Sequence, residues 1–348
     1  MPNFGNYIRR MRKRIPDKII LIQLMAIGDV LMCTPAIRAL RHKFPNAEIS
    51  FLVSDYAYDA LRHNPHIDKL IIYPRNLSRL AYIQFLFSLR QKKYNLLIDF
   101  QNNPRSHIMS LVIKSSRKIS FRSERRNLGY NDLISPPSVE VYAALAKLKL
   151  LTPLGIDEKQ DFLPEMPFNE NNLYDARETL KHLAYDNYKP IITLSPVTKR
   201  RYKMWNTDNY ARLCDHLIKE HEAQIVFTWG PGEKDVIEEI ISKMKEKAPD
   251  IDYKIKGLLH LTALFSLVNL HIGNDNGPRH FAISCGTPTI CIFGHINETH
   301  WTPPDSKIHL IISPQDRSDD PVIPRINSII FSEVLATCDL MLQKINKN

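Results

Sequence analysis

The chain has 348 residues, of which 44% are hydrophobic and 24% are charged. This composition excludes collagen-like, low-complexity and largely disordered proteins, and the length is sufficient for about two domains. The formal net charge of +10 lies wholly in the first half, since residues 1–168 contain 26 lysines and arginines against 14 acidic residues, whereas residues 169–348 contain 21 against 23. The first half is therefore expected to meet an anionic partner such as a nucleic acid, a phosphorylated glycan or a membrane surface.

Strand and helix signals alternate along the first half. The apolar run at 18–24 predicts a strand that ends in a loop at 25–29, and apolar residues then recur at helical spacing from Val30 to Phe44. Pro35 either opens this helix behind Thr34 or kinks it early. Further strands are predicted at 47–53, 68–73 and 94–100, with a helix at 80–91. This alternation is typical of parallel βαβ units in a doubly wound sheet.

The same pattern restarts after a segment rich in proline and glycine at 153–167. The sequence predicts strands at 190–194, 224–229, 270–273 and 289–293, helices at 209–220, 233–247 and 279–285, and a closing helix at 332–345. We therefore expect an α/β protein with a first domain at 1–165, a second at 166–330 and a closing helix within 331–348. Because open parallel sheets bind ligands beyond the carboxyl ends of their strands, a cleft between the domains is the expected site.

Cysteines and apolar segments indicate a cytoplasmic protein. The five cysteines form no CxxC pair and are odd in number, which argues against a disulfide scaffold or a zinc ribbon. The first apolar run is too short for a signal-peptide core. The longest uncharged stretch, 257–274, is expected to form a helix followed by a strand, and not a membrane span.

Two clusters account for much of the basic charge. Residues 9–14, inside a basic N-terminal segment at 1–17, either lie on anionic lipid or form a solvated terminus. The second cluster is expected to follow a strand, where it either lines a cleft or forms a solvated loop; it comprises Arg117, Lys118, Arg122, Arg125 and Arg126.

The loop after the first strand ends in Gly28 and Asp29. An aspartate just before a helix can serve as its N-cap. It can also act as a general base at the strand's carboxyl end, with Gly28 keeping the backbone clear for a substrate. Both interpretations remain open from the residues alone.

Loops of the second half combine hydroxyls, cations and glycines. Residues 273–280 follow a strand and open a helix, whose free N–H groups form an anion site for a pyrophosphate. Ser195 and Thr198 precede several cations including Lys203, and these groups suit phosphates. Glu233 either accepts hydrogen bonds from ribose hydroxyls or caps the next helix.

Other motifs are absent or misplaced. The sequence contains no GxGxxG, GxxxxGK[ST], HExxH or GxSxG, which excludes the corresponding dinucleotide, P-loop, zincin and serine-hydrolase signatures. A D-x-D at 250–252 is expected on an exposed loop, so no metal ligands are predicted.

Four segments together resemble one enzyme family, the ADP-heptose lipopolysaccharide heptosyltransferases of glycosyltransferase family 9. They are IQLMAIGDVLMCTPAIRALRHKFPNAEISFLV near the start, KMW at 203–205, WGPGE at 229–233 and GNDNGPRHFAISCGTPTICIFG at 273–294. The resemblance extends from about residue 18 to residue 303. It implies a GT-B fold, in which two Rossmann-like doubly wound domains face a cleft, and an inverting, metal-independent sugar transfer with the acceptor on the first domain and the nucleotide sugar on the second.

The resemblance also assigns roles to single residues. Asp29 matches the catalytic base, Lys203 the phosphate-binding lysine and Glu233 the ribose-binding glutamate. Asp275 matches the aspartate near the donor sugar, Gly277 a backbone phosphate contact and His280 the motif histidine. Ser195, Thr198 and Asn276 complete the expected nucleotide-sugar site. Asn276 and Arg279 depart from the residues usual in the family, as does Asn206 after Trp205, so another nucleotide sugar remains an alternative donor.

The expected partners follow from these roles and from the charge. We expect no cofactor besides the donor, for which the resemblance implies ADP-heptose. The expected acceptor is inner-core lipopolysaccharide, bound by Gly28, Arg105, Arg122, Arg125 and Arg126. The protein is expected at the cytoplasmic face of the inner membrane as a peripheral protein. A weaker alternative is a nucleic-acid-binding protein that uses the basic half, but aromatic residues make up only 9% of the chain and no basic-aromatic stripe is present.

Overall fold

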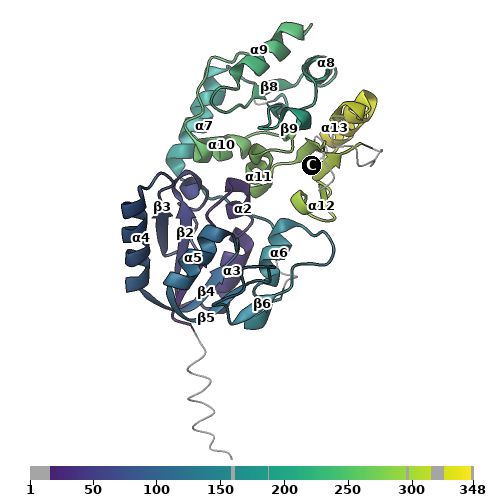
Figure 1. Ribbon diagram of the computed structural model, residues 1–348. Coiled ribbons are helices and arrows are strands. Elements are labelled where there is room, and N and C mark those ends of the chain that lie inside the picture. Colours follow the sequence, from purple (N-terminus) through teal and green to yellow (C-terminus); the bar gives the residue numbers. More distant parts are fainter. Residues whose placement is uncertain (1–15, 158–160, 187, 295–297, 315–324, 346–348) are drawn as a thin grey trace, which may run out of the picture. The chain divides into compact units, whose positions relative to one another are not determined.

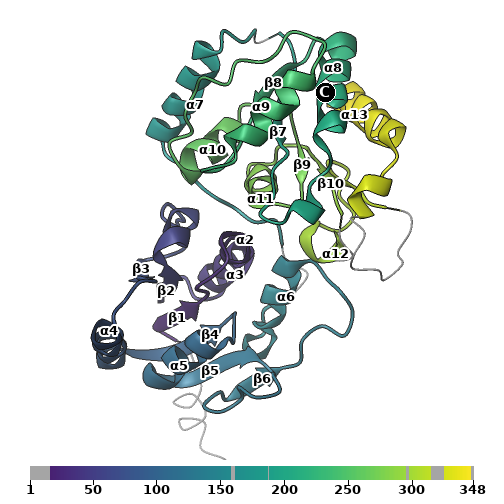
Figure 2. The same cartoon turned by 45° about the horizontal axis from the view of Figure 1, so that its top comes forward.

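The computed structural model describes residues 16–157, 161–186, 188–294, 298–314 and 325–345. The chain divides into two compact units, Met1–Glu165 and Met166–Asn348, and each is an α/β domain built on its own sheet (Figures 1 and 2). The basic cluster at 9–14 lies outside the described residues. No helix among the described residues is long and apolar enough to cross a membrane.

The first unit contains a six-stranded, fully parallel sheet in the order β3-β2-β1-β4-β5-β6. Its strands are β1 (Lys18–Ile22), β2 (Glu48–Ser54), β3 (Lys69–Tyr73), β4 (Lys93–Asp99), β5 (Lys114–Phe121) and β6 (Asp132–Ile134). In register, Ile20 of β1 lies between Ser50 and Leu97. This is the Rossmann strand order, and the order reverses between β1 and β4.

Helices cover both faces of this sheet. They are α2 (Ile27–Leu31), α3 (Thr34–Lys43), α4 (Arg79–Gln91), α5 (Pro104–Val112) and α6 (Ala143–Lys149), with 3₁₀ turns η1 (Asp55–Ala60) and η2 (Thr152–Leu154). One core lies between the sheet and the pair α4 and α5, where Ile20, Leu97 and Met109 are buried. Burial on both faces explains why the central strands are continuous apolar runs.

The second unit contains a five-stranded parallel sheet in the order β11-β10-β9-β7-β8. Its strands are β7 (Ile191–Ser195), β8 (Gln224–Phe227), β9 (Leu270–Asn274), β10 (Thr289–Ile292) and β11 (His309–Ile312). Its helices are α7 (Glu170–His182), α8 (Thr207–His221), α9 (Lys234–Lys243), α10 (Leu258–Phe265), α11 (Gly277–Ser284), α12 (Glu298–Trp301) and α13 (Phe331–Ile345), with 3₁₀ turns η3 (Arg201–Lys203) and η4 (Arg325–Ser328). This is the flavodoxin-like strand order, which reverses between β7 and β9.

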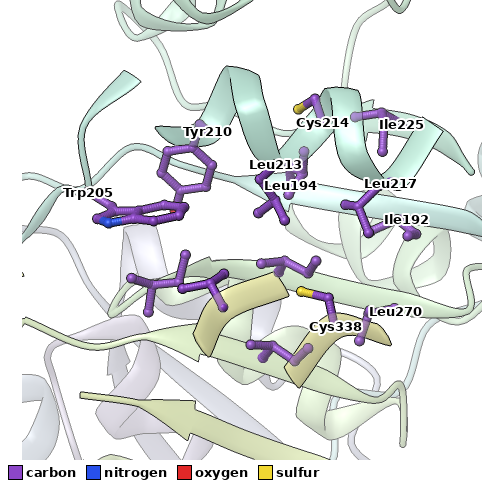
Figure 3. Close-up of a cluster of buried hydrophobic side chains, with 14 of the residues drawn as sticks. Ile192, Leu194, Trp205, Tyr210, Leu213, Cys214, Leu217, Ile225, Leu270 and Cys338 are labelled. Carbon is purple, nitrogen blue, oxygen red and sulfur yellow. The ribbon is translucent and has the colours of Figure 1, made fainter. Parts of the chain in front are cut away.

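The larger core of the second unit lies between the sheet and the helices α8 and α13 (Figure 3), and a second cluster joins the sheet to α7 and α10. Trp205, fully buried, packs edge-on against Tyr210 and is stacked on Phe331 at the start of α13, with ring centroids 5.3 and 5.9 Å apart. Val334, Cys338, Met341 and Leu342 of α13 continue this core. The closing helix is thus an integral layer of the second unit.

Several elements differ from the sequence prediction. The segment from Val30 to Phe44 forms two helices, α2 and α3, because the Thr34 hydroxyl donates to the Leu31 carbonyl at 2.8 Å and a new helix begins there. Pro35 lies in the first turn of α3, so it opens a helix and does not kink one. The helix expected at 233–247 ends at Lys243, because the Asp215 carboxylate accepts the N–H groups of Lys245 and Glu246 and draws the chain away from the helix.

Other elements were not predicted. The helices and strands of this kind are β5, β6, β11, α5, α6, α7 and α12. The β5 sequence, KSSRKISF, is polar at most positions and therefore lacks an apolar strand signal. Helices α5 and α7 each begin at an asparagine whose side chain accepts a first-turn N–H, which is a helix start signal in the sequence.

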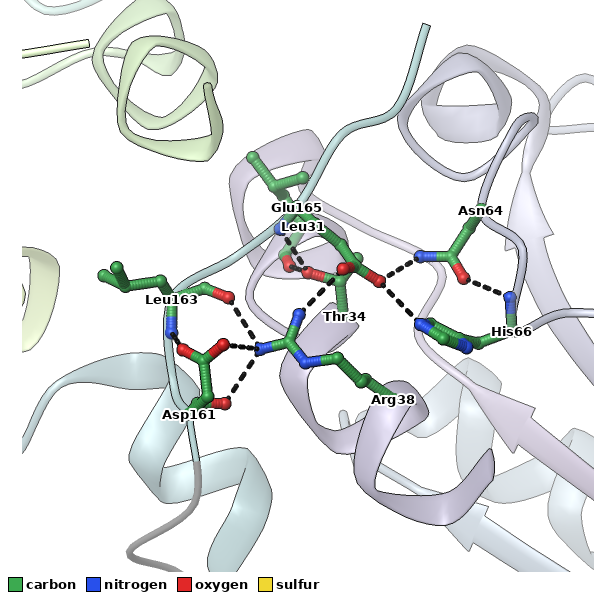
Figure 4. Close-up of polar contacts among 8 residues, drawn as sticks. All are labelled: Leu31, Thr34, Arg38, Asn64, His66, Asp161, Leu163 and Glu165. Atoms are coloured by element: carbon green, nitrogen blue, oxygen red, sulfur yellow. Dashed lines mark hydrogen bonds and ion pairs between the residues drawn. The ribbon is translucent and has the colours of Figure 1, made fainter. Parts of the chain in front are cut away.

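The end of the first unit is fixed to α3 by a network around Arg38 (Figure 4). The Arg38 guanidinium donates to the Glu165 carboxylate at 2.8 Å and to the carbonyls of Asp161 and Leu163 at 2.9 and 3.2 Å. Glu165 also accepts from the Asn64 amide at 3.1 Å, and the Arg38 side chain is only 15% exposed. Several hydrogen bonds therefore converge on one mostly buried ion pair.

We expect Arg38→Met to destabilise the first unit by about 1.5–3 kcal/mol, because it leaves the half-buried Glu165 carboxylate without its charged donor. The free energy of unfolding in urea, measured on the full chain, tests this. The matched control is Arg62→Met, which removes an exposed pair with Asp59 and should change stability by less than about 1 kcal/mol. Equal effects of the two substitutions would contradict the assignment.

Candidate active site

In the first unit, Asp29 lies beside the point where the strand order reverses. It follows β1, whose neighbours β2 and β4 continue in opposite directions across the sheet, and ligands bind at such points. Asp29 is half-buried at the third position of α2, and its carboxylate accepts the Ala26 N–H at 3.4 Å. The expectation of Asp29 as N-cap is therefore wrong, since Ala26 occupies that position. Gly28 precedes it in the same short helix.

Polar side chains join the carboxyl ends of β1 and β4, next to the reversal of strand order. The Gln101 side chain accepts the Leu24 N–H at 2.9 Å and donates to the Met25 carbonyl at 3.2 Å. The buried ammonium of Lys147, on α6, donates to Gln23 Oε1 and to the Phe100 carbonyl, each at 2.9 Å. These contacts hold the two strand-end loops in one arrangement.

Lys147 was not among the site residues predicted from the sequence. It lies in the helical segment AALAKLK, where a lysine is usually solvated, and nothing in that segment indicates burial. Its burial depends on the tertiary structure, because the two acceptors of the Lys147 ammonium lie more than 40 residues away in sequence.

The predicted acceptor arginines differ in their surroundings. Arg105 is exposed in the first turn of α5, directly after β4, and Arg122 and Arg125 are exposed in the loop after β5. Arg126 is half-buried, and its Nε donates to the Asn102 carbonyl at 2.7 Å, which joins this loop to the one after β4. Arg126 thus also has a structural contact.

The remaining two residues of that basic cluster do not lie in the loop. Arg117 and Lys118 are within β5, not after a strand. Arg117 forms an ion pair with Asp132 on the adjacent β6 at 2.7 Å, and Lys118 is buried and donates to the Ser110 carbonyl. Their charges are engaged in the sheet and its covering helix.

In the second unit, Lys203 and Asp275 form an ion pair beside the reversal between β7 and β9. Lys203 ends η3 in the loop after β7, and Asp275 directly follows β9. The Nζ–Oδ2 distance is 2.7 Å, and the side chains are 17% and 11% exposed. Two residues 72 positions apart in sequence are thus brought together at the edge where such sheets bind ligands.

The first turn of α11 lies at the same edge. Asn276 is its N-cap, and its amide group donates to the carbonyls of Ser195 and Val197 at 3.0 and 3.1 Å. A Cβ added to Gly277 would meet only Phe281 at 3.9 Å, an ordinary contact, so packing does not require this glycine. Pro278 carries no N–H and the Arg279 N–H is accepted by Asn276 Oδ1 at 3.5 Å, so the helix start leaves room beside the Gly277 N–H, at the end of a helix that favours anions.

The other predicted nucleotide-site residues already have partners in the protein. The buried Ser195 hydroxyl bonds to that of Thr228, and Thr198 donates to the Arg200 carbonyl at 2.7 Å. Glu233 occupies the N-cap position of α9 without capping it, and its carboxylate instead accepts the Gly230 N–H at 2.6 Å. The interpretation of Glu233 as a side-chain cap is therefore wrong, and the carboxylate closes the turn at 230–233.

Arg279 and His280 are buried in α11, and both contact the end of α12. Arg279 donates to the Trp301 carbonyl at 3.3 Å and to the Thr302 hydroxyl at 2.9 Å, and it has no carboxylate partner among the residues that the structure describes. Burial, together with the Arg279 charge, lowers the pKa of His280 to about 4, so its imidazole is neutral. The same two causes lower the pKa of His309 to about 4.

A buried guanidinium without a carboxylate partner among the described residues gives this edge of the second sheet a positive potential. From the sequence, Arg279 was noted only as a departure from the family pattern. Its burial and its contacts with residues 301–302 depend on the tertiary structure, so they could not be inferred from the local sequence. A positive potential beside free helix N–H groups favours an anionic ligand such as a diphosphate.

Within the described parts of the chain, one group of side chains is spaced closely enough to hold a metal ion. The ligand atoms of His216, His221 and Asp339 lie within 4.8 Å of one another. Each histidine Nε2 is 2.7 Å from Asp339 Oδ1, which joins α13 to α8 by hydrogen bonds. None of the predicted site residues belongs to this group.

Comparison with known proteins identifies the family. Residues 83–326 match the model of glycosyltransferase family 9 (heptosyltransferase). The chain belongs to glycosyltransferase family 9. The resemblance seen in the sequence is confirmed, and the protein is a glycosyltransferase.

Relatives and solved structures agree with this assignment. The lipopolysaccharide core heptosyltransferase OpsX of Haemophilus influenzae is 24% identical over 299 residues, which cover 83% of this chain and 82% of that protein. A family 9 glycosyltransferase from Veillonella parvula superposes with a TM-score of 0.85 at 20% identity, over 94% of this chain and 98% of that one. The Escherichia coli heptosyltransferase WaaC, solved with ADP-2-deoxy-2-fluoro heptose, gives a TM-score of 0.69 at 16% identity, over 92% and 99%. The predicted GT-B fold with two Rossmann-like domains is thereby confirmed.

We expect Lys147→Met to lower the free energy of unfolding by about 2–4 kcal/mol, because it leaves two buried acceptors, on Gln23 and Phe100, without a donor. Lys149→Met on the same helix, which removes a half-buried lysine, is the control and should change stability by less than about 0.5 kcal/mol. Urea denaturation of both variants measures the difference. A Lys147 variant as stable as the control would show that these hydrogen bonds do not support the β1 and β4 loops.

Proposed function

We propose that the protein transfers a heptosyl group from ADP-heptose to the inner core of lipopolysaccharide. Membership of the heptosyltransferase family supports the reaction class, and the named relatives support the acceptor class. The observation that carries the proposal is the Lys203–Asp275 pair beside the open first turn of α11. A cation, free N–H groups and a carboxylate are the groups that a sugar diphosphate needs.

The donor site would be built from the loops at the end of the second sheet. The N–H groups at Gly277 would bind the diphosphate together with Lys203, and Ser195, Thr198 and Asn276 would shape the loop that carries them. Glu233 would accept hydrogen bonds from the ribose hydroxyls, and Asp275 would lie near the sugar. The buried His280 would help to hold the start of α11 in place. Because these groups neutralise the diphosphate, we infer that no divalent cation is needed.

The chemical step would be a single displacement with Asp29 as general base. An acceptor hydroxyl oxygen attacks the anomeric carbon and forms the new glycosidic bond, while the bond between that carbon and the diphosphate oxygen breaks on the opposite face. The hydroxyl proton passes to the Asp29 carboxylate, and ADP leaves with the bonding electrons. Attack from the opposite face inverts the anomeric configuration. Lys203 and the α11 N–H groups stabilise the charge that develops on the leaving group.

The acceptor would bind the first unit. Its inner-core phosphates suit Arg105, Arg122, Arg125 and Arg126, and Gly28 would leave space beside the base. Lipopolysaccharide is anchored in a membrane by its lipid, so we also propose that the enzyme works as a peripheral protein on the cytoplasmic face of the inner membrane.

One observation supports an alternative donor, a nucleotide sugar other than ADP-heptose. The Asn276 amide is committed to the carbonyls of Ser195 and Val197, whereas the family usually has a hydroxyl side chain at this position. A changed contact here would suit a different nucleotide sugar, transferred to another cell-surface glycan by the same chemistry.

We expect Asp29→Asn to lower kcat for heptosyl transfer by about 10²–10⁴, because an amide cannot accept the acceptor proton. Transfer from ADP-heptose to a purified core acceptor, followed by mass spectrometry, measures kcat, and thermal shift with ADP should match the wild type. Wild-type activity should persist in EDTA. An Asn variant with wild-type kcat would remove Asp29 from the role of base, and a wild type that transfers no heptose would remove the proposed reaction.

We expect Gly277→Ala to weaken ADP binding by at least about tenfold while leaving the melting temperature of the free protein unchanged or slightly raised, because alanine favours the helix but its methyl group occupies the space left at the first turn. Calorimetric titration with ADP, UDP and GDP measures affinity and base preference together. Tighter binding of UDP or GDP would favour the second donor. Unchanged ADP affinity would show that the diphosphate binds elsewhere.

A further inference from the structure

Helix α4 of the first unit exposes an apolar face. Leu80, Ile83 and Phe87 are 66%, 50% and 64% exposed, and their spacing of three and four residues places them on one side of the helix. The other side is also apolar, since Leu89 is buried in the sheet core with Phe85 and Leu86 packed against it. A helix that covers a sheet needs only one apolar stripe, so the outer stripe has no function in the fold of this unit.

The apolar surface continues onto α5, which packs against α4. Ile108 and Leu111 are 43% and 41% exposed, and Leu128 in the loop after β5 is 76% exposed. Leu128 adjoins Leu111, because a Cβ on the next residue, Gly129, would lie 2.6 Å from Leu111 Cδ2. We call the six residues on these elements the α4–α5 face: Leu80, Ile83, Phe87, Ile108, Leu111 and Leu128. Exposed apolar patches of this kind mark interaction surfaces.

The chain segment that carries the α4–α5 face is rich in positive charge. Residues 75–131 contain twelve lysines and arginines but only two acidic residues, Asp99 and Glu124, and Asp99 is buried. Three of these cations are engaged elsewhere, since Arg75 pairs with Asp55, Arg117 pairs with Asp132 and Lys118 is buried. Arg79 and Arg90, near the two ends of α4, are exposed and form no ion pair with any described residue. A partner that is both apolar and anionic would complement this surface.

We propose that the α4–α5 face docks on an anionic phospholipid membrane, with Leu80, Ile83 and Phe87 at the boundary between headgroups and acyl chains and Arg79 and Arg90 against lipid phosphates. This inference rests on the proposed function, because an enzyme whose acceptor is lipid-anchored must work at such a surface. A second copy of the chain fits less well, since a two-fold interface would bring the same cations toward one another.

Vesicle binding by the full chain tests the proposal. Vesicles of phosphatidylglycerol and phosphatidylethanolamine are compared with neutral phosphatidylcholine vesicles in a flotation assay. We expect Ile83→Ser/Phe87→Ser to lower partitioning onto the anionic vesicles by at least about tenfold, and Arg79→Gln or Arg90→Gln to lower it by about fivefold each. The control, Tyr174→Ser/Leu340→Ser, removes equally exposed apolar residues from α7 and α13 of the second unit and should bind as the wild type.

Three outcomes would overturn the proposal. The first is that Ile83→Ser/Phe87→Ser binds anionic vesicles as well as the wild type, which would assign membrane binding to another part of the chain. The second is that the wild type binds no vesicles. The third is that the wild type is a dimer by light scattering and this variant a monomer, which would make the face a self-interface.

A parallel assay separates this proposal from the proposed function. Heptosyl transfer to a delipidated, water-soluble core acceptor needs no membrane, so Ile83→Ser/Phe87→Ser should retain the wild-type rate. Vesicle binding without any transfer by the wild type would count against the proposed function and leave the docking surface in place. Transfer without vesicle binding would count against the docking surface alone.

Discussion

In each unit, the reversal of strand order in a parallel sheet is the constraint on which the candidate site depends. On either side of the reversal, the connecting segments leave in opposite directions, so the strand ends between them are not covered by their own crossovers. Asp29 lies at this position after β1, and Lys203 and Asp275 lie there after β7 and β9. The sheet thereby brings together polar groups that are far apart in sequence, and it does so at the edge where the helices α2 and α11 begin.

Two buried cations support these edges without a carboxylate partner among the described residues. Lys147 donates to Gln23 and the Phe100 carbonyl, and Arg279 donates to the Trp301 carbonyl and Thr302, while its buried Nε has no partner among the described residues. Neutral acceptors meet the hydrogen-bonding needs of a buried cation but leave its charge uncompensated. Each unit therefore carries a fixed positive charge close to its reversal point, and in the second unit this charge lowers the pKa of His280 along with burial. Both edges are suited to anionic ligands.

The fold could be predicted from the sequence wherever a strand or a helix has a clear apolar pattern. The candidate site could be predicted only in part. Most residues of the central strands β1, β4 and β7 are apolar, so their alternation with helices indicates the doubly wound architecture. By contrast, β5 is polar and its pairing with β4 decides its conformation, which is why Arg117 and Lys118 were expected in a loop. The motif residues could be named from sequence, whereas Lys147 and the contacts of Arg279 could not, because their partners are tertiary.

The Lys203–Asp275 pair has a further consequence for the proposed reaction. A lysine held at 2.7 Å from a carboxylate and only 17% exposed is already ordered and largely desolvated, so little conformational entropy is lost when a diphosphate approaches it. The same carboxylate offsets part of the lysine's charge, which limits how tightly a diphosphate is held before and after transfer. As the bond to the anomeric carbon breaks, negative charge grows on the diphosphate, so its attraction to Lys203 and its repulsion from Asp275 both grow. In the proposed arrangement Lys203 lies against the diphosphate and Asp275 near the sugar, so the attraction acts over the shorter distance. The pair would then stabilise the transition state more than the bound donor, which is the condition for acceleration of the chemical step.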